Sequence, residues 1–352
     1  MKKSLLIAAA VLITFGACTN DDSAPGQEIT FKSVNQRSSK ALFHGPMSAT
    51  YNENEHFGVF SFYNDGTDTP KTFMNNVEIK KDDEQWRNVN VKYYWPTSGS
   101  LTFACYSPYD FIEGSTDDAT IVSATKDGGI TFTGFIAPTD SLKQIDLMVA
   151  DAITPETNSG VVTVTFKHIL SQIKFTARTK ENYKVNTNVS KIVINKVEVH
   201  KICIKGDYSS NNGTFEKGNW SLSSIQSDSV DYLVLSESTN PKEISLIGGI
   251  NDTVHIAKPI LIIPQNGTDT NWSSGDADKE DKIFEIKYTV TFKEGSTETE
   301  TTSEKTAYIK PNSDWEKGKI YTYNLVVGLN EITFNPEVEV WDAGTDTANG
   351  GI

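Results

Sequence analysis

Alternation of apolar and polar residues with a period of two recurs along most of the chain and predicts β-strands. In the first half the pattern covers residues 57–62, 89–95, 101–106, 160–166 and 172–177. In the second half it covers residues 192–204, 232–235, 260–263, 283–292 and 320–329. Clusters of Gly, Asn, Asp and Pro separate these segments, and almost none of the chain keeps a helical period for more than two turns. The pattern therefore predicts an all-β protein built of antiparallel β-sandwiches.

The chain becomes polar over Arg178-Thr179-Lys180-Glu181-Asn182, and strand-like segments resume near Ser190. A polar stretch without strand character is typical of a domain boundary, and 352 residues are enough for two domains. We therefore predict two sandwiches in tandem, an N-terminal one over residues 28–182 and a C-terminal one over residues 183–352.

The first residues have the layout of an export signal. Met1-Lys2-Lys3 is basic, and the apolar run from Leu5 to Phe15 is too short to span a bilayer, which takes about 20 residues. The run ends in Phe15-Gly16-Ala17-Cys18, which resembles a bacterial lipobox except that Phe15 stands where Leu is usual. We predict a lipoprotein signal peptide over residues 1–17, acylation (palmitate) of Cys18, and a polar tether over residues 18–27. The alternative is an ordinary signal peptidase site at which Cys18 occurs by chance.

The charge of the chain excludes one class of partner. Its 46 acidic residues outnumber the 32 Lys and Arg, the net charge is −14, and no basic run interleaved with aromatic residues occurs. Binding to nucleic acid depends on basic residues that neutralise phosphates, so we expect no nucleic-acid partner.

The sequence contains none of the common motifs of enzymes or metal sites. G-x-S-x-G, H-E-x-x-H, Walker and G-x-G-x-x-G segments are all missing, and the five His are scattered. We interpret His168 as a hydrogen-bonded structural residue, and Cys105 and Cys203 as buried free thiols, with a disulfide as the alternative. We expect no catalytic residue, no metal and no cofactor. A pair of glycoside hydrolase carboxylates, which need only meet in space, is the third-ranked interpretation.

Five landmarks follow one another along the chain: YYWPTSGSLTFACYSP (93–108), IDLMVA (145–150), FKHILS (166–171), IIPQ (262–265) and WEKGKIYTYNL (315–325). The ordered set, within residues 57–341, resembles the fimbrillin-like (Mfa-like) family, the subunits of type V pili. The resemblance implies two transthyretin-like sandwiches, export as a lipoprotein, and anchoring in the outer membrane through acyl chains until processing. It also implies that a protease removes an N-terminal strand at the cell surface, and that the C-terminal strand of a neighbouring subunit fills the groove by donor-strand exchange.

The C-terminal segment 331–341 fits a donor strand by its own pattern. Four apolar residues share one face of it, namely Ile332, Phe334, Val338 and Val340, while Thr, Asn and Glu hold the other. An unpaired strand with an apolar face is an association site, so either its own sheet or another molecule must cover it. Pro336 lacks a backbone donor and indicates a bend or an edge position.

Near the N-terminus, Glu28-Ile29-Thr30-Phe31 repeats the letters of Glu331-Ile332-Thr333-Phe334. If residues 28–37 are a removable strand and the C-terminal strand replaces it, both should offer the same side chains to the same pockets; coincidence is the alternative. The following segment, 35–40, is polar and turn-rich, and we predict proteolytic processing at Arg37, with Lys40 as a second candidate. A surface loop with an incidental Arg37 is the other interpretation.

These observations favour a non-enzymatic structural subunit or adhesin of a cell-surface pilus. Other pilus subunits are the expected partners, and a host glycan or host protein is a further candidate. The alternative is a lipid-anchored, monomeric glycan-binding lipoprotein that stacks sugars on exposed Trp or Tyr faces. For that function Trp220 and Trp272, flanked by polar residues, look loop-borne, whereas Trp95 and Trp315 lie within the landmarks and are expected to pack.

Overall fold

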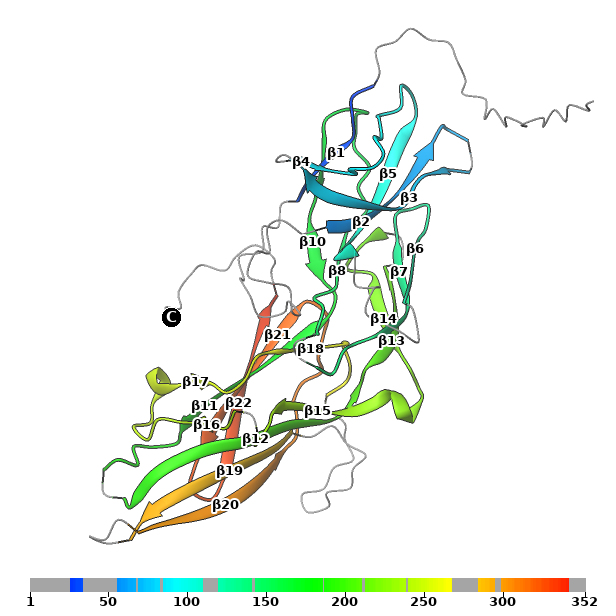
Figure 1. Cartoon of the computed structure of the whole chain (residues 1–352). Helices are drawn as coiled ribbons and strands as arrows, with labels where there is room; N and C mark the ends of the chain where they lie inside the picture. The colour runs from blue at the N-terminus through cyan, green and yellow to red at the C-terminus, as the bar shows by residue number, and fades with distance from the viewer. Residues whose placement is uncertain are drawn as a thin grey trace, which may run out of the picture.

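The structure is a computed structural model, and it describes residues 26–33, 56–67, 69–82, 85–109, 120–140, 143–185, 187–210, 213–238, 240–267, 284–294 and 299–341. These residues form β-strands and short 3-10 helices, among them η3 (Gln226–Asp228) and η4 (Ile250–Asp252). The described strands lie in four sheets. Together they make an elongated molecule with the early strands at one end and the late strands at the other (Figure 1). The predicted all-β class with antiparallel sheets is confirmed.

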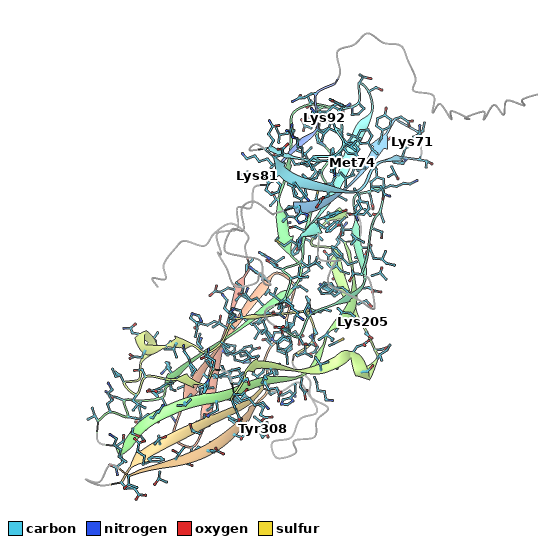
Figure 2. The ribbon with its side chains drawn as sticks, in the orientation of Figure 1. Lys71, Met74, Lys81, Lys92, Lys205 and Tyr308 are labelled. Atoms are coloured by element: carbon cyan, nitrogen blue, oxygen red, sulfur yellow. The ribbon has the colours of Figure 1, made fainter. Side chains whose placement is uncertain are left out.

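An eight-stranded sheet dominates the N-terminal region. Its order is β10 (Phe166–His168), β8 (Met148–Ala150), β5 (Ser100–Ser107), β2 (His56–Asn64), β3 (Lys71–Asp82), β4 (Gln85–Arg87), β1 (Thr30–Ser33) and β9 (Val161–Val164). The last strand in this order, β9, runs in the chain almost directly into β10, which pairs with β8 at the opposite end. The sheet therefore curls on itself around an interior core that contains Phe57, Phe103 and Met74. Met74 is labelled in Figure 2.

A four-stranded sheet covers one side of this curl. Its order is β14 (Gly218–Leu222), β13 (Lys205–Ser210), β7 (Ile130–Ile136) and β6 (Ile121–Ala124). Strand β5 contributes to both cores, because Phe103 and Cys105 face the interior of the curled sheet while Ala104 and Tyr106 pack in the cluster that contains Phe132. Since both faces of β5 are covered, its sequence is a nearly continuous apolar run.

The C-terminal region is a sandwich of two sheets. One sheet contains β17 (Val254–His255), β11 (Ser171–Thr179), β21 (Lys319–Val327) and β22 (Ile332–Val340), with β18 (Ile260–Ile262) also paired to β11. The other contains β15 (Ser229–Leu235), β12 (Val189–Cys203), β19 (Phe284–Lys293) and β20 (Glu300–Ile309), with β16 (Lys242–Glu243) paired to β12. At the centre of the core between the sheets, the rings of Phe175, Phe284 and Tyr323 have centroids 4.6 to 5.6 Å apart.

Strand β22 runs back toward the N-terminal region. Strand β11 begins at Ser171, just after β10, and β21 is parallel to it, so both strands run away from the N-terminal sheets. Strand β21 ends beside Thr179, and β22 returns antiparallel to it over nine register pairs. The turn between β21 and β22 therefore lies at the end of the molecule that is far from β1 (Figure 1).

The strand pairings divide the chain differently from the predicted boundary at residue 182. Strand β11 precedes that boundary but belongs to the C-terminal sandwich. Strands β13 and β14 follow it but form a sheet with β6 and β7. The polar stretch 178–182 is the end of β11 and the start of its connection to β12, and these two strands lie in the two facing sheets of one sandwich. A polar connection between two sheets carries the same sequence signal as a linker between two domains.

One predicted strand is wrong. Residues 89–95 hold only an isolated bridge at Tyr94. The carboxamide oxygen of Asn88 accepts the backbone N–H groups of Asn90 and Val91, which forms a tight turn that leaves Val89 and Val91 exposed. The long strands β3 and β20 were not predicted, and β20 in particular is polar along most of its length.

Candidate functional site

Strand β1 lies between two other strands of the curled sheet. It pairs in parallel with β9 from Thr30 to Ser33, and antiparallel with β4 where Phe31 lies opposite Trp86. Just before β1, the N–H of Ile29 donates to the carbonyl of Tyr93 at 2.7 Å. The removal of this segment would therefore expose two strand edges at once, those of β4 and β9.

The apolar residues of this segment reach the core of the curled sheet. Ile29 is 2% exposed and Phe31 is 3% exposed. The ring of Phe31 packs edge-to-face against Phe57, with centroids 5.8 Å apart, and against Phe103, at 5.7 Å. Aromatic residues from β2 and β5, and Trp86 of β4, thus belong to the core cluster that packs against β1, and they would line the groove left if β1 were removed.

A polar contact fixes the same segment at its N-terminal side. Glu28 lies between two cations, with its Oε2 3.7 Å from an Arg87 nitrogen and 3.6 Å from Lys92 Nζ. Arg87 is also bonded to Asp82, at 2.6 and 3.0 Å. Lys92 lies at the same end of the molecule as β1 (Figure 2). These two cations favour an acidic residue at the position of Glu28.

Strand β22 occupies a different kind of position, at the end of its sheet. Among the described residues its only ladder is with β21, from Val327 opposite Ile332 to Lys319 opposite Val340. Pro336 therefore lies on an edge strand, as its sequence predicts. Ile332 and Phe334 are half-buried against the core of the sandwich, and the Phe334 ring lies 5.8 Å from that of Tyr323.

The second half of β22 is poorly covered. Val338 is 52% exposed and Val340 is 66% exposed, although Val338 is paired with Tyr321, which is buried. The predicted apolar face is therefore present, but the chain's own sandwich covers only its first part. A strand of this kind has apolar surface to offer to another molecule.

Both ends of β22 are held by side chains. At the start, Lys180 Nζ lies 2.5 Å from Glu331 Oε1, which raises the pKa of Lys180 and lowers the pKa of Glu331. At the other end, Trp341 stacks on His168, with ring centroids 3.8 Å apart, and the backbone N–H of Trp341 donates to the carbonyl of Gly318. His168 Nδ1 is in turn 2.8 Å from Asp146 Oδ1.

The sequence profile of the fimbrillin-like family matches residues 47–341. The chain belongs to the fimbrillin-like family. It is 24% identical to the fimbrium subunit Fim1C of Phocaeicola vulgatus in an alignment of 383 positions that covers 98% of both chains. A crystal structure of a fimbrial protein from Bacteroides vulgatus is 21% identical, covers 81% of this chain and 92% of its own, and superposes with a TM-score of 0.60. At that identity, the superposition shows a common fold.

Of the site residues predicted for this fimbrillin-like chain, some lie outside the described residues. These are Cys18, Arg37 and Lys40. The four predicted donor residues are all described, and they share one strand. Within the described residues, no helix is long and apolar enough to cross a membrane.

The cysteines are buried as predicted, whereas the predictions for the tryptophans hold only in part. Cys105 and Cys203 are buried free thiols, as predicted, and burial raises the pKa of Cys105. Trp95 and Trp315 are buried, also as predicted. Trp220 is not loop-borne, because it lies in β14 and its indole N–H donates to the carbonyl of Ile169 at 2.7 Å. Trp272 lies outside the described residues.

A charged cluster lies on β12 and β19. Glu198, His200 and Glu285 place their polar atoms close together, a geometry that could hold a cation. Lys196 Nζ already fills that role, at 2.6 Å from Glu198 and 3.3 Å from Glu285. Burial acts to lower the pKa of Lys196, but the bonds to the two carboxylates outweigh it and raise that pKa. The cluster is therefore a compensated ion-pair network.

Sequence patterns did not indicate the partners of β1 and β22. Arg87, Lys92 and Trp86 come from a short strand and the turn after it, and their relation to Glu28 and Phe31 depends on the closure of the sheet. The stacking of Trp341 on His168 joins the end of β22 to the landmark at residues 166–171, which lies far away in the chain. No local period in the sequence identifies this contact.

Proposed function

We propose that the protein is a structural subunit of a cell-surface fimbrium that polymerises by donor-strand exchange. In this proposal it is exported as a lipoprotein acylated at Cys18, cleaved near Arg37 or Lys40, and joined to other subunits through its C-terminal strand. The name of the relative Fim1C, a fimbrium subunit, supports the first part. Export and cleavage rest on the sequence of residues 1–40.

The position of β1 is the observation that carries the proposal. The strand lies between β4 and β9 and buries Ile29 and Phe31, yet it precedes the segment that contains the predicted cleavage site. Burying two such side chains stabilises the fold by about 3–6 kcal/mol. A cut after β1 would turn a covalently attached strand into a peptide that can leave. What remains would be an apolar groove with two unpaired edges, a site that accepts an extended strand.

The proposed donor strand, β22, must separate from β21 before it can pair with another subunit. In the free subunit β22 is paired with β21 along its whole length, and Trp341 holds its end. Strand exchange therefore replaces one ladder by another, so the net gain is smaller than the burial in the groove alone. The driving force comes from apolar residues that are better covered in a neighbour's groove than at the edge of β22. This makes the cleavage of β1, rather than the affinity of the free strand, the controlling step.

The test combines mass spectrometry with gel electrophoresis of the protein recovered from the cell surface. We expect a chain that begins at Ser38 or Ala41 and a ladder of multimers that is stable in an unboiled sample and collapses on heating. A chain that still begins at acylated Cys18 and migrates as a monomer would contradict strand exchange and would favour the glycan-binding alternative.

Matched variants sharpen this test. The double variant Arg37→Ala, Lys40→Ala should keep residues 28–37 attached and prevent the ladder. Lys32→Ala removes a basic residue that is exposed on β1 and should be processed and assembled as the wild type is. A ladder in the uncleavable double variant would show that assembly does not need the removal of β1.

A further inference from the structure

The sequence Glu-Ile-Thr-Phe occurs twice, as residues 28–31 at the start of β1 and as residues 331–334 at the start of β22. In the first copy, Ile29 and Phe31 are almost completely buried in the groove of the curled sheet. In the second copy, Ile332 and Phe334 are only partly buried at the edge of the sandwich. Two isoleucine–phenylalanine pairs with the same spacing thus differ mainly in how well they are covered.

We propose that Glu331-Ile332-Thr333-Phe334 of one subunit replaces Glu28-Ile29-Thr30-Phe31 in the groove of a second copy of this chain, residue for residue. This inference rests on the proposed strand exchange and adds its partner, register and direction. Ile332 takes the pocket of Ile29, and Phe334 takes the pocket of Phe31 against Phe57 and Phe103.

The order of the letters fixes the direction of the incoming strand. Residues two apart in a strand lie on the same face, so Ile and Phe enter neighbouring pockets in either direction. Only a strand that runs as β1 does puts Ile in the Ile29 pocket, Phe in the Phe31 pocket and Glu beyond the Ile. The donor is therefore antiparallel to β4 and parallel to β9, as β1 is.

The charges around the groove support the same register. In the uncleaved chain Glu28 lies between Arg87 and Lys92. With β1 gone, these two cations would face the groove without that carboxylate, and Glu331 would arrive at its position. In exchange Glu331 gives up Lys180, an exposed partner. A donor shifted by one residue would bring an apolar or hydroxyl side chain to the cations and turn its apolar face outward.

The location of the β21–β22 turn allows the exchange between two copies. The turn lies at the end of the molecule far from β1, so a strand that swings out about residues 328–330 points away from its own groove. The groove of the next copy is at that copy's opposite end. The register begins only a few residues after Val327, so this end of the sandwich must lie directly against the N-terminal region of the next copy.

Disulfide trapping tests the register in the full chain displayed and processed on cells. Thr30 pairs with Val161 of β9, so the proposed register brings Thr333 opposite Val161. Both side chains are exposed, and neighbouring strands hold Cα atoms within reach of a disulfide. In its own subunit Thr333 is paired with Val326, so a 333–161 bond can only join two copies. The native Cys105 and Cys203 are buried.

We expect Thr333→Cys with Val161→Cys to give a ladder that survives boiling and is lost on reduction. The matched controls Asn335→Cys and Glu337→Cys, each with Val161→Cys, should form ladders that still collapse on heating. Cross-linking in either control, without cross-linking at 333, would overturn the register while leaving strand exchange intact. The absence of any ladder, in the wild type as well, would overturn the proposed function and this inference together.

A charge exchange provides a second readout that does not depend on thiols. Lys92→Glu should slow ladder formation by about two- to fivefold, the range of a surface ion pair. The compensating Glu331→Lys change in the same chain should recover most of that loss. Arg87 is left unchanged, because it also bonds Asp82 within its own subunit. No recovery in the double variant would contradict the placement of Glu331 beside Lys92.

Discussion

Strands β1 and β22 begin with nearly the same side chains but occupy different positions in their sheets, β1 between two strands and β22 at an edge. Strand β1 is enclosed, with a four-pair ladder to β9 on one side, the Phe31–Trp86 pair to β4 on the other, and Phe31 in contact with two further aromatic rings. Strand β22 is an edge strand with one ladder and two exposed valines. The difference shows that the position in the sheet, rather than the side chains, sets how firmly each strand is held. In the proposed strand exchange, this difference is the reason for a covalent cut, since the weaker-held strand would not displace the tethered one.

Alanine substitutions of Phe31 and Phe334 should show the largest difference in stability between the two strands. In the unprocessed chain, Phe31→Ala should lower the free energy of unfolding of the N-terminal region by about 3–5 kcal/mol, because it leaves a cavity among packed rings. Phe334→Ala should cost only about 1–2 kcal/mol, because that side chain is partly exposed. Urea unfolding followed by tryptophan fluorescence measures both. Equal losses would show that the two strands are held alike.

The contact at the end of β22 should give the next largest effect. Trp341→Ala removes the ring stacked on His168 and should cost about 2–3 kcal/mol, less than a central aromatic residue. The last residues of β22 should then exchange amide hydrogens faster, while the first residues stay protected. Trp341→Phe serves as the control, because it keeps an aromatic ring at the site. Unchanged protection of the strand end in Trp341→Ala would show that the ladder with β21 is sufficient.

The exposed valines should contribute least to the free subunit. Val338→Thr and Val340→Thr should each change the free energy of unfolding by less than about 0.5 kcal/mol, as at other surface positions. The matched change Val162→Thr, in the buried side of β9, should be clearly destabilising. If Val338→Thr destabilised the free subunit as much as Val162→Thr, the second half of β22 would be better covered than its exposure indicates.

The ion pair at the start of β22 predicts a small dependence on pH. The pKa of Glu331 is lowered, so its contribution is present above the unfolded pKa and is lost as the pH falls through the folded pKa. The pKa of Lys180 is raised, so its contribution is present below the unfolded pKa and is lost as the pH rises through the folded pKa. Glu331→Gln should therefore lower the melting temperature slightly at pH 7 and not at pH 2. High salt should abolish the difference, because both groups are exposed.

Much of this fold follows from local sequence patterns, and the rest depends on how strands that are distant in the chain pair and how the N-terminal sheet curls. The alternation at 331–341 predicted a strand with one apolar face, and β22 has that face. The apolar settings of Cys105 and Cys203 predicted buried thiols, and both are buried. The sequence could not predict that β13 joins a sheet with strands of the N-terminal region, because its partner β7 lies some 70 residues earlier in the chain. The same limit hid the cations around Glu28, which meet it only when the sheet curls.

The parallel pairing of β11 with β21 has a mechanical consequence for a fibre. In a fibre joined by the proposed strand exchange, a pull from the next subunit would enter through the short turn after Val327 and act along β21. The opposing pull would reach β11 at Ser171, directly after β10 of the N-terminal sheet. Tension would then slide the two strands past each other, so that all eight register pairs resist together instead of opening one at a time. The chain topology would thus place a ladder loaded in shear in the line of force of such a fibre.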